Sequence, residues 1–168
     1  MAGLFRPSDD AWVMPDRTPT DLASACRAIE NLIAAYAERV DGGDFAAVGT
    51  LLAHASFTGA AGSASGADVI EEMLRENVIV YEDGTPRTKH VVTNIAIEVD
   101  AEAGTASARS YFTVLQALPD LPLQIIVSGR YFDRFARDDG QWRFAERRVR
   151  TDLLGDVSHH LRRAVTDP

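Results

Sequence analysis

The sequence predicts a single α+β domain in which helices pack on one face of a strongly curved antiparallel β-sheet. A change in the pattern of apolar residues supports this prediction. Apolar residues recur at helical spacing up to about residue 75, and from about residue 88 they alternate with a period of two. Helices followed by consecutive strands are typical of α+β domains. A chain of 168 residues is long enough to bury one core.

The first predicted helix begins at Thr18-Pro19-Thr20-Asp21, where a capping threonine precedes a proline at the first helical position. An apolar stripe then recurs at helical spacing until Gly42-Gly43 ends it. The stripe consists of Leu22, Cys26, Ile29, Ile33, Tyr36 and Val40. Cys26 is the only cysteine, so a disulfide framework and a cysteine-based zinc site are excluded.

Two shorter helices and four strands complete the predicted domain. Asp44 can cap a second helix that extends to Leu52, and Ser65-Gly66-Ala67-Asp68 repeats the capping pattern ahead of a third helix. A loop rich in glycine and alanine, residues 59–67, joins these two helices. The predicted strands are 88–100, 104–117, 123–137 and 141–153, separated by turn-forming segments.

We expect residues 18–154 to form the domain, with an N-terminal arm at residues 1–17 and a C-terminal tail at residues 155–168 that can be helical. The arm has no sustained period, but its Trp12 could dock on a partner subunit. The pair His159-His160 lies in the tail without acids or cysteines at ligand spacing. No metal site is therefore predicted there, and a surface helix is expected.

The charge distribution excludes some classes of partner. A net charge of −8 argues against the broad basic surface that nucleic-acid binding needs. Several basic residues fall between Arg130 and Arg150, but acids lie among them, so an arginine-laced sheet face is predicted. The sequence shows neither a secretory signal nor an apolar run long enough to span a bilayer, so we expect a cytoplasmic protein without membrane partners.

The strand at 88–100 raises the question of a pocket. Strict alternation would place Val91, Thr93, Ile95, Ile97 and Val99 on the core face. His90 and Asn94 would then share the other face, which suits either solvent or the wall of a part-polar pocket. The next strand carries a row of small and apolar residues: Ala106, Ala108, Ser110, Phe112 and Val114. A solvated face would carry more charge, so the pocket is favoured.

Two residues of the first helix are also unusual. Tyr36 lies in line with the apolar stripe, so its hydroxyl needs a hydrogen-bond partner or a cavity. Asp41 lies at the helix C-terminus, where the helix dipole disfavours a carboxylate. Asp41 can serve a site, or it can cap the turn at Gly42-Gly43 through its side chain.

The order of these short signatures resembles the SnoaL-like branch of the NTF2-like superfamily over about residues 20 to 153. The segments that carry the resemblance are Ile29-Glu30-Asn31-Leu32, Tyr36, Asp41-Gly42-Gly43-Asp44-Phe45, Thr88-Lys89-His90-Val91-Val92-Thr93-Asn94, Ser110-Tyr111, Gly129-Arg130-Tyr131-Phe132-Asp133, Trp142-Arg143-Phe144, Arg147-Arg148-Val149 and Asp152. The resemblance implies an NTF2-like cone of three helices and a curved antiparallel sheet around a deep pocket. It also implies a homodimer formed through the sheet.

The resemblance implies a function as well. Bile acid 7α-dehydratase and scytalone dehydratase types use a tyrosine and an aspartate of the first helix and a histidine of the sheet, which correspond to Tyr36, Asp41 and His90. We expect a cofactor-independent dehydratase or isomerase, without a metal, for a hydrophobic oxygenated substrate of polyketide, steroid or aromatic type. His90 would be the general base, Asp41 would orient it, and Tyr36 would donate a hydrogen bond to the developing enolate.

We expect the substrate to contact further side chains on the sheet: Asn94, Ser110, Phe112, and Arg148 or Arg150. The resemblance favours Arg150 over Arg148, although both can instead form cross-strand ion pairs with Asp133 or Glu146. The bile acid enzyme has an aspartate on its second long strand that this chain lacks, which argues against a substrate of the bile acid type.

Two alternatives stay open, because one fold hosts many functions. The first is a different enzyme, a polyketide cyclase or an epoxide hydrolase. The second is a non-catalytic ligand-binding or accessory subunit, as in dioxygenase β-subunits. Convergence of Tyr36, Asp41 and His90 on an enclosed cavity would favour catalysis, whereas a Trp12 segment in contact with a partner would favour the accessory role. The sequence does not identify the substrate.

Overall fold

The computed structural model describes residues 19–60 and 62–163, so the predicted contact of Trp12 lies outside the described residues. Within these ranges the chain forms three helices and a curved, open six-stranded sheet in the order β2-β1-β6-β5-β4-β3. The helices are α1 (Pro19–Asp41), α2 (Phe45–Leu51) and α3 (Ala67–Asn77). The strands are β1 (Ser56–Gly59), β2 (Gly62–Ser65), β3 (Thr88–Asp100), β4 (Thr105–Leu118), β5 (Leu121–Asp138) and β6 (Gln141–Leu154).

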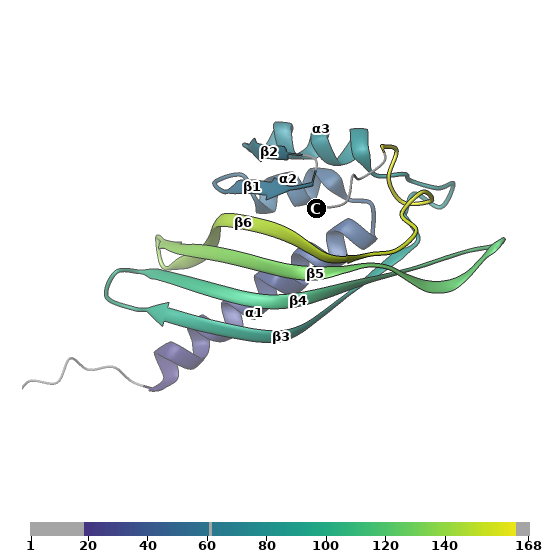
Figure 1. Cartoon of the computed structure of the whole chain (residues 1–168). Coiled ribbons are helices and arrows are strands. Elements are labelled where there is room, and N and C mark those ends of the chain that lie inside the picture. The colour runs from purple at the N-terminus through teal and green to yellow at the C-terminus, as the bar shows by residue number, and fades with distance from the viewer. Residues whose placement is uncertain (1–18, 61, 164–168) are drawn as a thin grey trace, which may run out of the picture.

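The molecule is an α+β cone, as predicted. Helix α1 runs across one face of the sheet, and α2, α3 and the β1-β2 hairpin gather at the β6 edge (Figure 1). The sheet is mixed rather than purely antiparallel, because β1 pairs parallel to β6. The β1-β2 hairpin occupies most of the segment predicted as a loop, since strands of only four residues, rich in Ser and Gly, give little periodic signal.

Helix α1 ends where the sequence predicts, and this end positions Asp41. Gly43 adopts a left-handed φ of 71°, and a Cβ at this position would lie 2.2 Å from the carbonyl oxygen of Gly84. Only glycine tolerates both conditions. Asp44 then caps α2 by accepting a hydrogen bond from the amide of Ala47 at 3.0 Å. The capping pattern predicted for α3 is not formed, because Gly66 is its N-cap residue and no side chain caps it.

The predicted core face of β3 is wrong for the first half of the strand. Val91 is 43% exposed and Ile95 is 38% exposed, so both point away from the helices. His90 and Val92 point inward instead, where they pair with the buried Val114 and Phe112 of β4.

A β-bulge accounts for the error. The register between β3 and β4 shifts between Thr93 and Ala96, and Asn94 within the bulge has a φ of 52°. The extra residue moves Ile97 and Val99 onto the inner face, where they pack against the core. One strand therefore supplies the pocket wall with its first half and the core with its second half.

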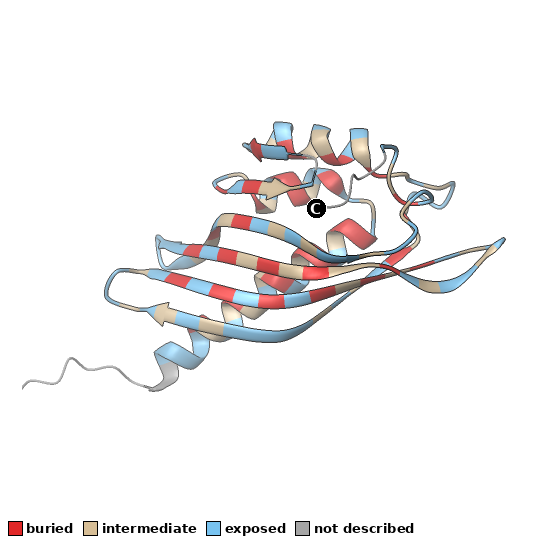
Figure 2. Ribbon diagram, in the orientation of Figure 1, coloured by how far each residue is buried: buried red, intermediate tan, exposed pale blue. Residues whose placement is uncertain are grey.

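The row of small and apolar residues on β4, which the sequence predicts as part of a pocket wall, is buried. Buried and exposed residues alternate along β4 and β5 (Figure 2). Most of the core consists of apolar side chains from α1, α2, β4 and β5. None of the helices in the described ranges is both long enough and apolar enough to cross a membrane.

The segment that follows β6 returns to the body of the domain. Residues 158–160 form a turn, and Leu161 forms an antiparallel bridge with Val78, directly after α3. His159 is exposed at the surface as expected, but His160 is only 8% exposed, which corrects the prediction that both histidines lie on a surface helix.

Candidate functional site

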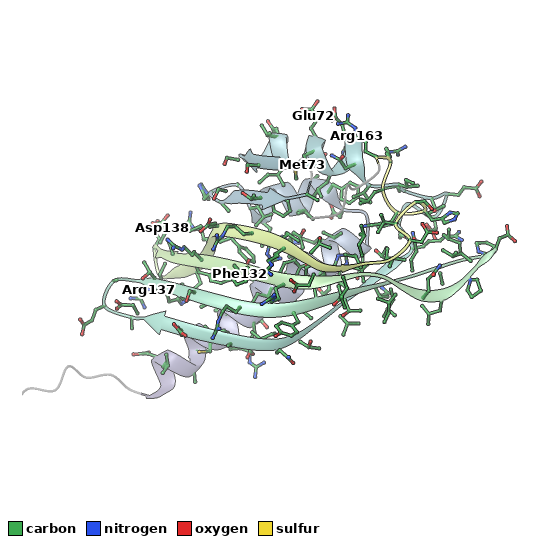
Figure 3. All side chains as sticks on the ribbon, viewed as in Figure 1. Glu72, Met73, Phe132, Arg137, Asp138 and Arg163 are labelled. Atoms are coloured by element: carbon green, nitrogen blue, oxygen red, sulfur yellow. The ribbon has the colours of Figure 1, made fainter. Side chains whose placement is uncertain are left out.

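A cavity of about 880 Å³ lies between the inner face of the sheet, helices α1 and α3, and the segment after β6. Its volume falls in the range of about 300–1,000 Å³ that is typical of small-molecule sites. Much of the wall is apolar, and it includes Phe57, Leu74, Phe112, Val127, Val149 and Leu161. Met73 of α3 and Arg163 of the C-terminal segment also line it, and Figure 3 labels both near α3.

Two tyrosines and two histidines line the same cavity: Tyr36, His90, Tyr131 and His160. The sequence predicted a site at Tyr36 and His90, and the structure brings both into one wall. Tyr131 and His160 were not predicted. A mostly apolar cavity with a few convergent polar groups is typical of sites that bind and orient an oxygenated organic molecule.

Asp41 does not line the cavity but lies directly behind His90. An oxygen of its carboxylate, Oδ1, lies 2.6 Å from Nδ1 of His90, and the side chains of His90 and Asp41 are 8% and 7% exposed. The other oxygen, Oδ2, accepts the backbone N–H of His90 at 2.8 Å. Because a carboxylate only accepts hydrogen bonds, Nδ1 carries the proton and Nε2 keeps its lone pair. This tautomer is the one that a general base requires.

Thr88 completes the anchoring of Asp41. Its hydroxyl donates to Oδ1 at 2.8 Å, and Thr88 itself is buried. Burial of the carboxylate raises the pKa of Asp41, but the hydrogen bonds and charge of His90, together with the bond from Thr88, outweigh burial and lower the pKa below its ordinary value. Asp41 therefore stays ionised at neutral pH. Its unfavourable position at the C-terminus of α1 is compensated by these three donors.

Tyr36 and Tyr131 form an aromatic wall on the inner side of the cavity. Their rings meet edge to face at 5.9 Å, and Tyr131 stacks on Phe112 at 4.5 Å. Neither hydroxyl has a hydrogen-bond partner among the described residues, so both can donate to a bound molecule. Burial raises the pKa of both tyrosines, although the cation of Arg147 acts in the opposite direction. Both are neutral donors at physiological pH.

Arg147 holds this aromatic wall from behind. Its guanidinium lies 4.2 Å from the ring centroids of both Tyr36 and Tyr131. Two hydrogen bonds of 2.9 and 2.7 Å join it to Asp133, and both side chains are completely buried. Burial would lower the pKa of Arg147, but the carboxylate of Asp133 raises it above its ordinary value, so the ion pair persists in the interior.

The structure separates the other predicted site residues. Phe112 lines the cavity, and Ser110 is buried on the same face of β4 with a hydroxyl that has no partner among the described residues. Asn94 is exposed in the β-bulge, because the register shift moves it out of the inner row. Its predicted contact with a substrate is not compatible with this position.

Of the two predicted arginines, Arg150 is among the residues that line the cavity and Arg148 is not. Arg148 pairs with Glu146, and Arg150 pairs with Asp152. Their side chains are 57% and 62% exposed, so both guanidinium groups lie largely in solvent and take part in surface ion pairs. Alternation along β6 explains this result, because the inward position belongs to Arg147, whose cross-strand pairing with Asp133 was predicted for its neighbours.

The unpredicted residues carried weak signals in the sequence. Tyr131 and Arg147 lie at inward positions of β5 and β6, but the sequence alone did not fix which face of each strand is buried. His160 gave no signal, because its burial depends on the bridge between Val78 and Leu161. Within residues 19–60 and 62–163 no cluster of three or more His, Cys, Asp or Glu side chains could hold a metal ion.

Comparisons with known proteins show what the chain is similar to. A model of the SnoaL-like domain family matches residues 22–148. No curated protein matches the chain. Among solved structures, a protein of unknown function from Mycobacterium tuberculosis is 27% identical with a TM-score of 0.67, and the match covers 82% of this chain and 78% of that one.

Two structures from Novosphingobium aromaticivorans are also similar. A candidate scytalone dehydratase is 27% identical with a TM-score of 0.64, and the match covers 82% of this chain and 89% of that one. The β subunit of a candidate aromatic-ring-hydroxylating dioxygenase is 20% identical with a TM-score of 0.65, over 80% of this chain and 93% of that one. The second likeness shows the fold alone.

Proposed function

The chain belongs to the family of SnoaL-like domains, and from this premise we propose that it is a cofactor-independent lyase or isomerase of the dehydratase type. The observation that carries the proposal is the pair formed by His90 and Asp41 in the wall of the cavity. The substrate we propose is a hydrophobic molecule that bears a carbonyl or enol oxygen. The similarity to a candidate scytalone dehydratase supports this class of reaction.

In the proposed reaction, Nε2 of His90 removes a proton from the carbon next to the carbonyl group. The electron pair of the broken C–H bond forms an enolate, whose oxygen accepts hydrogen bonds from Tyr36 and Tyr131. Asp41 stabilises the imidazolium without taking its proton. In a dehydration, the enolate then re-forms the carbonyl, a C=C bond replaces the bond to a β-hydroxyl, and His90 returns its proton to the leaving oxygen as water. In an isomerisation, His90 returns the proton to another carbon.

Proton abstraction can be tested without the natural substrate. The ketone 2-tetralone is apolar, fits a cavity of about 880 Å³, and carries acidic C–H groups beside its carbonyl. In deuterium oxide, ¹H NMR should show catalysed loss of these signals with the wild-type protein. His90→Gln should abolish the catalysis, whereas His54→Gln, which replaces an exposed histidine, should not.

The same experiment separates the proposed enzyme from an accessory subunit. A general base contributes about 10²–10⁴-fold to a rate, so the loss in His90→Gln is measurable if catalysis occurs. Exchange at the buffer rate with wild-type protein, or equal exchange in wild type and His90→Gln, would overturn the proposal and favour the non-catalytic alternative.

We also propose that the chain is a homodimer. Apolar side chains are exposed on the face of the sheet that points away from the helices, among them Val91, Tyr111 and Ile125. Such an exposed apolar face is typical of a surface that another protein covers. The similarity to a dioxygenase β subunit supports the fold of this face but not its partner.

A further inference from the structure

His160 is a second imidazole in the wall of the cavity, and the proposed reaction does not use it. It lies beyond residues 22–148, which match the family model, so the family pattern does not account for it. It lines the cavity together with His90, although the two are 70 positions apart in the sequence. The residue is only 8% exposed.

The backbone around His160 is fixed by hydrogen bonds to three parts of the domain. The amide of Ile79 donates to the carbonyl of His160 at 2.9 Å, and the amide of Arg162 donates to the carbonyl of Asn77 at 2.9 Å. The carbonyl of His159 accepts hydrogen bonds from Gln116 at 3.0 Å and from the hydroxyl of Tyr81 at 2.7 Å. His160 is therefore held in place as a rigid part of the wall.

The ring nitrogens of His160 differ in their surroundings. Nδ1 is completely enclosed and has no hydrogen-bond partner among the described residues. Enclosed N–H groups without an acceptor are rarer than enclosed acceptors without a donor. We therefore assign the lone pair to Nδ1 and the proton to Nε2, which makes Nε2–H the nitrogen available to a molecule in the cavity.

The ring is also neutral at physiological pH. Burial, together with the charge of His90, lowers the pKa of His160 from 6.5 to about 4, although Asp41 acts in the opposite direction. The two imidazoles in the cavity therefore differ in the form that their surroundings stabilise. His90 has a carboxylate that stabilises its charged form, whereas His160 has no such partner and stays an uncharged donor.

We propose that His160 is a substrate-contacting residue that donates a hydrogen bond from Nε2 to an oxygen of the bound molecule in the cavity that His90 also lines. This inference rests on the proposed function for the nature of the substrate. A neutral imidazole can polarise a carbonyl or steady a leaving hydroxyl without releasing a proton. In a ketone with a single oxygen, such as 2-tetralone, the acceptor is the carbonyl oxygen itself, which can accept from Nε2 of His160 as well as from a tyrosine hydroxyl.

The test uses 2-tetralone with the full-length protein and two adjacent histidines as a matched pair. His160→Leu removes the donor, and His160→Gln keeps an amide N–H close to the position of Nε2. His159→Leu replaces the exposed neighbour, whose contacts come from its backbone. We expect kcat/KM for deuterium exchange to fall on the order of 100-fold in His160→Leu, to recover substantially in His160→Gln, and to stay unchanged in His159→Leu.

A second measurement on the wild-type protein needs no variant to fold. With ¹⁵N-labelled histidine, the Nε2 resonance of His160 should identify a protonated nitrogen, and it should shift when 2-tetralone saturates the cavity. If the wild type catalyses exchange but His160→Leu matches it, the inference about His160 fails while the proposed function stands. If the wild type does not catalyse exchange, the proposed function fails, and the presence or absence of the Nε2 shift still decides the contact with His160.

Discussion

Asp41 and His90 are 49 positions apart in the chain, yet the carboxylate of Asp41 accepts both the backbone N–H and the ring Nδ1–H of His90. These two bonds fix the rotation of the ring as well as its tautomer. The aspartate is supplied by the end of α1 and the histidine by the start of β3. The orientation of the base is therefore determined by how the first helix packs on the sheet.

Replacing the carboxylate should change the tautomer of His90. In Asp41→Asn, an amide of similar shape can donate to Nδ1, which would move the ring proton to Nε2 and remove the lone pair that faces the cavity. We expect deuterium exchange into 2-tetralone to fall by up to about 10⁴-fold, because the wrong tautomer cannot accept a proton. The ¹⁵N shifts of the two ring nitrogens should exchange their positions relative to wild type. Unchanged ¹⁵N shifts would show that Asp41 does not set the tautomer.

Removing one member of the buried ion pair of Arg147 and Asp133 should strongly lower the free energy of unfolding, whereas replacing both residues with apolar ones should lower it only slightly. Arg147→Met leaves the completely buried carboxylate of Asp133 without its partner, so we expect the free energy of unfolding to fall by about 3–5 kcal/mol. Arg147→Met combined with Asp133→Leu should recover most of this loss. Urea unfolding of the three proteins measures the effect.

An exposed ion pair provides the control for this prediction. Arg143→Met breaks the bond to Asp138, where the side chains are 34% and 62% exposed, and should change the free energy of unfolding by less than about 1 kcal/mol. Equal costs for Arg143→Met and Arg147→Met would contradict the assignment of Arg147 as the residue that supports the aromatic wall.

Stability should fall with mild acid because of His160. The pKa of His160 is lowered from 6.5 to about 4 in the folded protein, so unfolding takes up a proton between these two values. The free energy of unfolding should therefore decrease as the pH falls through this window, by about 2 kcal/mol between pH 7 and pH 5. Asp41 does not contribute between pH 7 and pH 5, because its pKa is lowered to below this range. Protonation of Asp41 reduces stability only in stronger acid.

The contribution of His160 can be isolated by subtraction. Urea unfolding of wild type and His160→Gln at both pH values removes the effect of the other histidines, which are common to the two proteins. The difference in unfolding free energy between wild type and His160→Gln should change by about 2 kcal/mol between pH 7 and pH 5. A constant difference would show that His160 is charged or solvated in the folded state.

Charges on the outer face of the sheet should prevent the proposed homodimer. Tyr111 is 49% exposed and Ile125 is 59% exposed, so their replacement by lysine removes apolar surface without disturbing the core. Light scattering should give twice the mass of one chain for wild type and a single-chain mass for Tyr111→Lys with Ile125→Lys. Glu72→Lys on α3, an exposed site away from the sheet, is the matched control. A single-chain mass for wild type would refute the homodimer.

The sequence was sufficient for the fold because its elements begin and end at residues with strong local preferences. Gly42-Gly43 ends α1 because of its backbone conformation, and Asp44 starts α2 through a hydrogen bond. The family resemblance includes the same residues. The pairing of Asp41 with His90 is a geometric result that the family pattern anticipated, although their roles in a reaction stay proposals.

The wrong predictions on β3 and β6 have the same physical cause: the sequence does not show which face of a strand is buried. A single extra residue at Asn94 exchanges the inner and outer faces of β3 beyond that point, and the sequence analysis did not identify a bulge there. The same ambiguity on β6 directed attention to Arg148 and Arg150 instead of Arg147. His160 could not be found from local pattern, because its burial depends on a bridge to Val78 that is remote in sequence.

The position of His160 after β6 has a consequence for the order in which the protein becomes competent during synthesis. The ribosome releases α1 and β3 before the segment that carries His160, so the cavity gains this part of its wall only when the last described residues pack against Asn77 and Ile79.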